Sequence, residues 1–191
     1  LAELLDQLQT EDLTFAQIAA AAAELDLPAW WGVTQAFLQV ISKEWPAKLS
    51  ELGKIDPAMH RNAMLRGEAN RLAKLQSNDP VIVAGSTGTI PATADLIFAI
   101  AKLPSGAVVL PGYDLSMSDA TKSDLENSDD MASAIGHPQY GMHHLVLKIG
   151  AKGLVEQLSA RVDEALQERG KWVSAALEPA SRTAAWPQLR S

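Results

Sequence analysis

Residues 81–111 contain the feature that most constrains the fold, a strand–loop–helix–strand pattern. Val81–Ala84 is a short apolar run of mostly β-branched residues, which is typical of a buried parallel strand. Ala107–Leu110 is a second such run, and Pro91 begins a helix between the two. The inward face of that helix is expected to carry Ala94, Ile97, Phe98 and Ala101. This spacing has the size of a right-handed βαβ crossover and predicts an α/β protein with a partial parallel sheet.

The residues before this unit have helical periodicity. Thr14, with Gln17 three residues later, is a capping-box pattern that begins a helix over residues 15–25. Pro46 is expected to break or restart the next helix, and Gly53 to end it. A third, long helix should begin at Asp56-Pro57 and run to about residue 75. Two apolar faces are predicted, one of Trp30, Val33, Phe37, Val40, Ile41 and Trp45 and one of Met59, Leu65, Ala69 and Leu72.

The C-terminal part begins with an acidic stretch between Tyr113 and His137. It is rich in Ser, Asp and Asn and has little periodicity, which predicts a long surface loop with room for one helical turn. Helices are expected over residues 138–149 and 155–169, and a last one should end near Leu177, before an extended tail. We therefore predict a helical subdomain over residues 1–78 and an α/β segment with C-terminal helices over residues 79–191.

Charge and composition exclude several classes of protein. The chain has no cysteine, so disulfides and thiolate metal sites are excluded. No apolar run is long enough to span a bilayer and no signal peptide is recognisable, so we expect a cytoplasmic protein without a membrane partner. The chain begins at Leu1 without an initiator Met, which predicts that it is a piece of a longer protein.

The net charge of −7 argues against strong autonomous binding to a phosphate backbone. Residues 43–74 nevertheless carry a local excess of positive charge, with seven Lys and Arg against four Asp and Glu. Such a stretch is either a solvated helix face or a DNA-facing surface.

The loop after the first strand is the candidate binding site, and it consists of Gly85, Ser86, Thr87, Gly88 and Thr89. A loop between a strand and a helix N-terminus can hold an anion with its backbone N–H groups. However, the chain has neither a Walker-type lysine motif nor a G-x-G-x-x-G motif. The alternative is a tight turn in which glycines permit unusual backbone angles and Thr89 caps the helix. No bound cofactor is expected.

Two catalytic alternatives rest on the same region. Ser86, Asp114 and either His137 or His143 follow the order of a serine hydrolase triad. Pro91 would interrupt the helix that follows a nucleophile elbow, and the helical upstream region offers no oxyanion-hole loop, so this interpretation is disfavoured. His143 and His144 are adjacent and would point about 100° apart on a helix, so they cannot converge on one metal ion.

Residues 80–114, PVIVAGSTGTIPATADLIFAIAKLPSGAVVLPGYD, resemble the alphaproteobacterial type of the AddB family of double-strand break repair proteins. The AGSTGTIPATA and GAVVLPG blocks are the specific parts of this resemblance. Other matching segments follow in order over about residues 35–190. They are Phe37-Leu38 with Trp45-Pro46, Asp56-Pro57 with Arg61-Asn62, residues 137–141 (HPQYG), and residues 177–186.

The resemblance implies a P-loop helicase-like fold and a segment of a subunit that pairs with AddA in an ATP-dependent helicase–nuclease acting on double-stranded DNA ends. In that family the N-terminal part is helicase-like but regarded as lacking motor activity, and the nuclease with its iron–sulfur cluster lies at the C-terminus. An active motor of this class ends the strand equivalent to Val81–Ala84 in acidic residues that hold Mg²⁺. Here that strand runs into Gly85-Ser86, so the segment is expected to be catalytically inert. The acidic stretch 115–134 matches poorly, and no function transfers to it.

Overall fold

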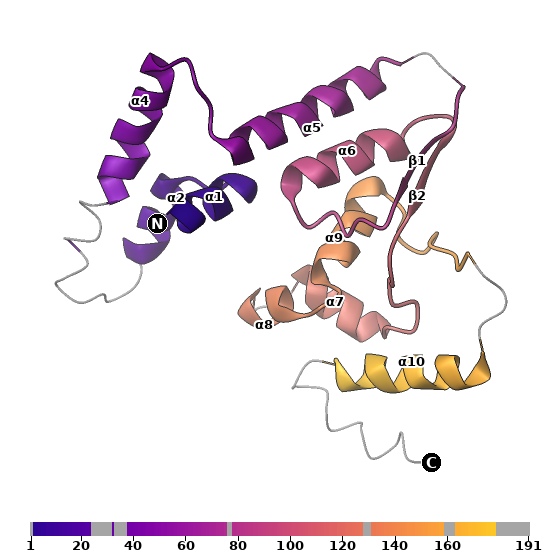
Figure 1. Cartoon of the computed structure of the whole chain (residues 1–191). Coiled ribbons are helices and arrows are strands. Elements are labelled where there is room, and N and C mark those ends of the chain that lie inside the picture. The colour runs from indigo at the N-terminus through magenta and orange to yellow at the C-terminus, as the bar shows by residue number, and fades with distance from the viewer. Residues whose placement is uncertain are drawn as a thin grey trace. The chain divides into compact units, whose positions relative to one another are not determined.

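The computed structural model describes residues 2–23, 32, 38–75, 78–127, 131–158 and 163–178. The described chain is mixed α/β, mostly helical, with a two-stranded parallel sheet (Figure 1). It divides into two compact units, one of residues 1–74 and 90–96 and the other of residues 75–89 and 97–191. The predicted boundary at residue 78 stays a prediction. Within the described residues, no helix has the length and apolar character needed to cross a bilayer.

The first unit is built from helices. They are α1 (Ala2–Thr10), α2 (Phe15–Ala23), the π-helical turn η1 (Val40–Glu44), α4 (Trp45–Glu51) and α5 (Pro57–Ala73). The predicted capping box before α2 is confirmed: the Thr14 N–H donates to Gln17 Oε1 at 2.7 Å, and the Gln17 N–H donates to Thr14 Oγ1 at 3.3 Å. Residues 24–30, which include the predicted end of this helix, lie outside the described residues.

Two sequence signals around α4 are also confirmed. Pro46 stands where the π-helical turn gives way to α4, so the helix restarts there. Gly53 has a φ of +60°, a left-handed conformation that favours glycine, and the next residue, Lys54, donates its N–H back to the Leu49 carbonyl at 2.9 Å. This is the 6→1 bond of a helix-ending Schellman motif.

Helix α1 packs against α5, and the buried apolar residues of these two helices are Leu8, Ala58 and Leu72. The predicted apolar faces are partly wrong. Val40, Trp45 and Met59 are exposed. The Trp45 side chain is 41% exposed, and its indole N–H donates to the Asp56 carboxylate at 3.2 Å. Leu65 and Ala69 are half-buried, and Trp30, Val33 and Phe37 lie outside the described residues.

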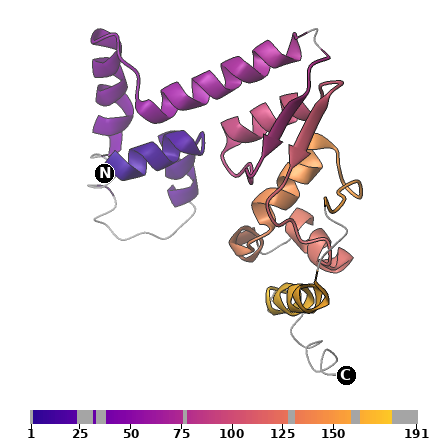
Figure 2. The same ribbon diagram turned by 45° about the vertical axis from the view of Figure 1, so that its right-hand side comes forward.

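The sheet of the second unit pairs β1 (Val81–Ala84) with β2 (Gly106–Val109), as Figure 2 shows. The pairing is parallel, in the register Val81↔Gly106 to Ala84↔Val109, so the predicted crossover through α6 (Pro91–Ala101) is confirmed. The expectation that β1 is buried on both sides is wrong. Its side chains alternate, and Ile82 is 64% exposed, because the described elements cover only one face of the sheet.

Helix α6 buries its small and branched residues. Ala94 and Ile97 are buried as predicted, together with Ala92 and Ile100. Phe98 was expected to point inward but is exposed, and Lys102 Nζ lies 5.3 Å from the centre of its ring. A cation over an aromatic face is a favourable way to leave a phenyl ring at the surface.

The acidic stretch after β2 contains two helices and is not the long loop predicted from its composition. They are α7 (Asp119–Asn127) and α8 (Met131–Gly136). Ser118 caps α7 by accepting the Thr121 N–H at 3.1 Å, and Thr121 and Leu125, four residues apart, are buried on one face. The cap stabilises the first turn of the helix, and contacts with α9 stabilise the helix as a whole.

The last helices are α9 (Tyr140–Ile149) and α10 (Glu164–Ala176). Helix α9 agrees with the prediction and buries Met142, His143, Leu145 and Val146. Residues 155–158 are not helical, so the predicted helix over 155–169 is wrong at its start. A single helix begins after Asp163, whose carboxylate accepts the Ala165 N–H at 2.9 Å, and it ends at Leu177 as expected.

The first residue of β2 offers a sharp test of the packing. A Cβ added to Gly106 would lie 1.8 Å from the Ile100 carbonyl oxygen, and neither backbone can move without breaking the crossover. We expect Gly106→Ala to lower the free energy of unfolding by about 3 kcal/mol or more, measured by urea denaturation. Gly67→Ala is the matched control: it lies within α5 with open space around it, so it should raise stability by about 0.5–1 kcal/mol. A well-folded Gly106→Ala protein would contradict the packing.

Candidate functional site

The predicted anion loop, residues 85–89, is a tight turn whose polar groups bond mainly within the fold. Gly85 and Gly88 have φ angles of +77° and +63°, which L side chains rarely adopt. The Gly85 N–H donates to the Val109 carbonyl at 3.1 Å, and the Gly88 N–H donates to Ser86 Oγ at 3.3 Å. Two of the N–H groups that an anion would need are therefore already used by the protein.

Helix α9 packs directly on this loop, and two glycines allow the close approach. A Cβ on Gly88 would lie 2.6 Å from Leu145 Cδ2, and a Cβ on Gly141 would lie 2.7 Å from Thr89 Cγ2. Thr89 does not occupy the cap position, because Ile90 provides the carbonyl that accepts the first helical bond, from Ala94. This geometry supports the interpretation of the loop as a packed turn, and its role as an anion site stays a prediction.

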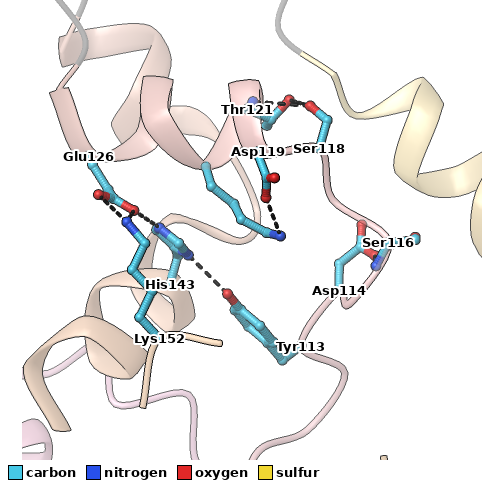
Figure 3. Close-up of polar contacts among 10 residues, drawn as sticks. Tyr113, Asp114, Ser116, Ser118, Asp119, Thr121, Glu126, His143 and Lys152 are labelled. Atoms are coloured by element: carbon cyan, nitrogen blue, oxygen red, sulfur yellow. Dashed lines mark hydrogen bonds and ion pairs between the residues drawn. The ribbon is translucent and has the colours of Figure 1, made fainter. Parts of the chain in front are cut away.

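A chain of polar contacts around His143 lies next to this packing (Figure 3). The His143 ring is 1% exposed, with Nδ1 3.0 Å from the Tyr113 hydroxyl and Nε2 3.0 Å from Glu126 Oε1. Lys152 Nζ donates to the same carboxylate at 2.7 and 2.9 Å. The bonds are all satisfied when Tyr113 donates to Nδ1 and the Nε2–H donates to Glu126. Both ring nitrogens are occupied, so the ring links α9 to α7 and to the segment of Tyr113, and it has no nitrogen left for a substrate.

These contacts shift two pKa values in opposite directions. The Lys152 ammonium, and after it the His143 ring, hold the pKa of Glu126 below its usual range. Burial raises the pKa of Tyr113, with a smaller contribution from the negative charges of Asp114 and Glu126. Tyr113 therefore stays a neutral donor, and Glu126 stays an anion.

Asp114 orders the turn that leads from β2 to α7. Its Oδ1 accepts both the backbone N–H of Ser116 at 2.8 Å and the Ser116 hydroxyl at 2.6 Å. Burial pushes the pKa of Asp114 upward, but hydrogen bonds from Ser116, Ser174 and nearby backbone outweigh this and hold it below its usual range. The carboxylate therefore acts as an acceptor that fixes the turn.

The end of α10 is fastened to the start of α7. The Thr121 hydroxyl, which is buried, donates to the Glu178 carboxylate and lies 2.7 Å from the Ser118 hydroxyl. Sequence reasoning assigned no role to Thr121, Glu126 or Lys152. The signal that it missed was Ser118 followed by Asp119, a cap residue and an acid in the first turn of a helix.

The residues suggested for a hydrolase are each bonded elsewhere. The Ser86 hydroxyl bonds to the Gly88 N–H, Asp114 bonds to Ser116, and His143 lies between Tyr113 and Glu126. His137 accepts the Gln139 N–H on Nδ1 at 3.2 Å, as expected for a histidine that ends the acidic stretch on nearby backbone. Among the described residues, no group of three or more His, Asp or Glu side chains could hold a metal ion.

Three of the seven Lys and Arg side chains of residues 43–74 form ion pairs with described residues of the first unit. Arg66 donates from Nε to Asp95 at 3.0 Å and from Nη1 to Asp12 at 3.1 Å, which raises its pKa. Lys48 and Arg71 pair with acids three residues away along their helices, and Arg61 donates to the Thr10 hydroxyl at 2.7 Å. A DNA-facing role for this stretch stays a prediction.

No family model, curated protein or solved structure matches this chain.

The contact between the loop and α9 predicts different costs at two similar glycines. Gly85 and Gly88 both have positive φ, but only Gly88 faces a neighbour, the buried Leu145 side chain. We expect Gly85→Ala to lower the free energy of unfolding by about 1 kcal/mol, from backbone strain alone. Gly88→Ala should lower it by about 1–3 kcal/mol more, because Leu145 must move within a packed core. Equal losses in urea denaturation would show that α9 does not pack on the loop.

The lowered pKa of Glu126 predicts that Glu126→Gln lowers the stability of the protein by an amount that depends on pH. A carboxylate with a lowered folded-state pKa stabilises the protein above its unfolded-state pKa of about 4.5 and loses that contribution as pH falls toward the folded value. Because the Lys152 side chain is 62% exposed, solvent weakens its ion pair with Glu126. We therefore expect Glu126→Gln to lower the free energy of unfolding by only about 1 kcal/mol at pH 7.

The measurement is thermal unfolding of the unsubstituted protein and of Glu126→Gln between pH 7 and pH 3. The difference between their melting temperatures should become smaller below pH 4.5. Glu156→Gln removes one exposed carboxylate from the same unit and should leave the melting temperature nearly unchanged. A difference in melting temperature between Glu126→Gln and the unsubstituted protein that stays constant with pH would contradict the ion pair.

Proposed function

We propose that this chain is a non-catalytic segment of an AddB-type subunit in an ATP-dependent helicase–nuclease that acts in double-strand break repair and recombination. The observation that carries the proposal is the resemblance of residues 80–114, above all the blocks AGSTGTIPATA and GAVVLPG. The segment acts as a scaffold that contacts the AddA-type subunit and guides double-stranded DNA ends, in the cytoplasm.

The end of β1 supports the absence of motor activity. In motors of this class, acidic side chains at this position hold Mg²⁺ and polarise the attacking water. Here the strand ends at Ala84 and is followed by Gly85, which has no side chain, and the Ser86 hydroxyl bonds to the Gly88 N–H. This turn offers no carboxylate to a metal ion. It therefore cannot support hydrolysis by the mechanism of an active motor.

The open face of the sheet supports the proposal that the segment belongs to a larger, P-loop helicase-like domain. Ile82 and Ala107 are register partners in the two strands, and both are exposed, as is Ala84. Parallel sheets occur almost only with both faces covered, because their helical crossovers lie on the faces. An apolar face left open by the described elements is therefore a surface that further strands or helices of the same domain would cover.

The inert turn predicts which substitutions leave ATP hydrolysis unchanged. In the full-length subunit, assembled with its AddA-type partner and DNA ends, Ser86→Ala and Thr87→Ala should alter the ATPase rate by less than about twofold. Substituting the Walker-type lysine of the partner in the same complex should abolish hydrolysis and serves as the positive control.

Three results would overturn parts of this proposal. A loss of more than about tenfold in Ser86→Ala or Thr87→Ala would assign the loop a catalytic role. Failure of the full-length subunit to co-purify with an AddA-type partner would remove the family assignment. Amide shifts confined to residues 85–89 on titration with millimolar nucleotide or sugar phosphate would favour the alternative of a phosphate-binding module.

A further inference from the structure

The first unit has an apolar groove with an acidic rim that the proposed function does not use. It has a volume of about 1090 Å³ and lies between α1, the η1–α4 helix and the start of α5. Its apolar walls come from Ala2, Leu5, Val40, Trp45 and Pro57. Val40 and Trp45 are large side chains that remain substantially exposed, which is unusual for two residues facing one concave surface.

One polar junction holds these walls in place. The Asp56 carboxylate, at the position before α5, accepts the Trp45 indole N–H at 3.2 Å and the Gln9 side-chain amide at 2.7 Å. A single side chain thus connects α1, α4 and α5 and fixes the plane of the Trp45 ring. The groove is therefore built by hydrogen bonds and does not depend on packing alone.

The rim of the groove is negatively charged. Glu3 and Asp6 from α1 and Glu44 from η1 line it with Asp56, against Lys48 as the one lining cation. Lys48 is already paired with Glu51 at 2.9 Å. Among the described residues, Glu3, Asp6 and Glu44 have no Lys or Arg within ion-pair distance. An apolar floor with unpaired acids at its edge is complementary to a ligand with an apolar face and flanking cations.

The shape of the groove selects a helix. Residues from Ala2 to Thr10 line it, so it follows α1 over a length of about 13 Å. That length matches about two and a half turns of a ligand helix, enough for apolar anchors at i, i+3, i+4 and i+7. The acidic rim would repel an anionic membrane surface, which disfavours lipid as the occupant.

We propose that this groove is a docking site for a basic amphipathic helix of a partner protein. The apolar side of the helix lies on Val40, Trp45 and Leu5, and its flanking Lys or Arg side chains pair with Glu3, Asp6 and Glu44. This inference does not depend on the proposed role in DNA repair, since it uses only the charge and shape of the first unit.

The test uses the full chain and two synthetic 14-residue helices with Leu at i, i+3, i+4 and i+7. One carries Lys at the flanking positions and the other carries Glu, and both are labelled for fluorescence anisotropy. We expect the Lys helix to bind with a Kd of about 10–100 μM at 50 mM NaCl, at least tenfold tighter than the Glu helix, and to weaken about fivefold or more at 500 mM NaCl.

Two sets of variants locate the site. The double variant Glu3→Lys/Asp6→Lys should weaken binding of the Lys helix about tenfold. Glu156→Lys/Glu164→Lys makes the same change in net charge on exposed residues of the second unit and should change binding by less than twofold. Val40→Glu places a charge on the apolar wall at an already exposed position and should also abolish binding, with circular dichroism to show that the helices remain.

Several results would overturn the proposal. These are no binding of the Lys helix up to 1 mM, equal binding of both helices, or equal losses in the two double variants. Unchanged binding in Val40→Glu would show that the peptide uses another apolar surface, such as α10, which exposes Leu166, Trp172 and Val173. Binding of the chain to phosphatidylglycerol vesicles that is lost in Val40→Glu would assign the groove to lipid.

Discussion

The close approach of α9 to the turn after β1 is the contact on which the second unit depends. At this point the backbone of Gly88 meets the Leu145 side chain, and the backbone of Gly141 meets Thr89. The helix can come so near only because neither glycine has a side chain, and the gain is a core in which Leu145 and Val146 are almost fully buried. The same contact joins residues 88–89, the end of the predicted anion loop, to α9.

The polar contacts of the second unit follow from that placement of α9. Once α9 lies on the turn, His143 is buried and must satisfy both ring nitrogens, which it does with Tyr113 and Glu126. These two partners come from the segment after β2 and from α7, so one imidazole fixes the acidic stretch that follows the sheet. Lys152 then balances the charge of Glu126 from the solvent side.

Local patterns in the sequence predicted the elements with a local cause. The capping box at Thr14 and Gln17, the restart at Pro46 and the stop at Gly53 depend on residues within a few positions of each other, and the structure confirms all three. The β1–α6–β2 crossover was predictable because its strand runs are apolar and its helix begins at a proline. The exposure of Ile82, by contrast, depends on which elements cover the sheet, and no pattern within the strand records that.

The features that the sequence did not predict depend on contacts between residues that are distant in the chain. Helix α7 was hidden by its acidic composition, since its stability depends on contacts with α9 and on the Thr121–Glu178 bond, which are distant in the sequence. Trp45 was assigned to a core because its spacing is helical, yet its position is set by a hydrogen bond to Asp56, eleven residues away. The packing of residues 85–89 against α9 could not be predicted, because Leu145 and Gly141 lie more than fifty residues further along the chain.

The open sheet face and the groove of the first unit differ in the kind of partner that they suit. The open sheet face consists of aliphatic side chains without charge, so it resembles half of a domain core and fits a permanent covering. The groove of the first unit combines an indole held by hydrogen bonds with carboxylates that, among the described residues, have no ion-pair partner. Charges at a rim remain solvated when a groove is empty, so such a surface tolerates both the free and the bound state. The two surfaces therefore differ in chemistry, since the sheet face is aliphatic and uncharged and the groove is rimmed by carboxylates.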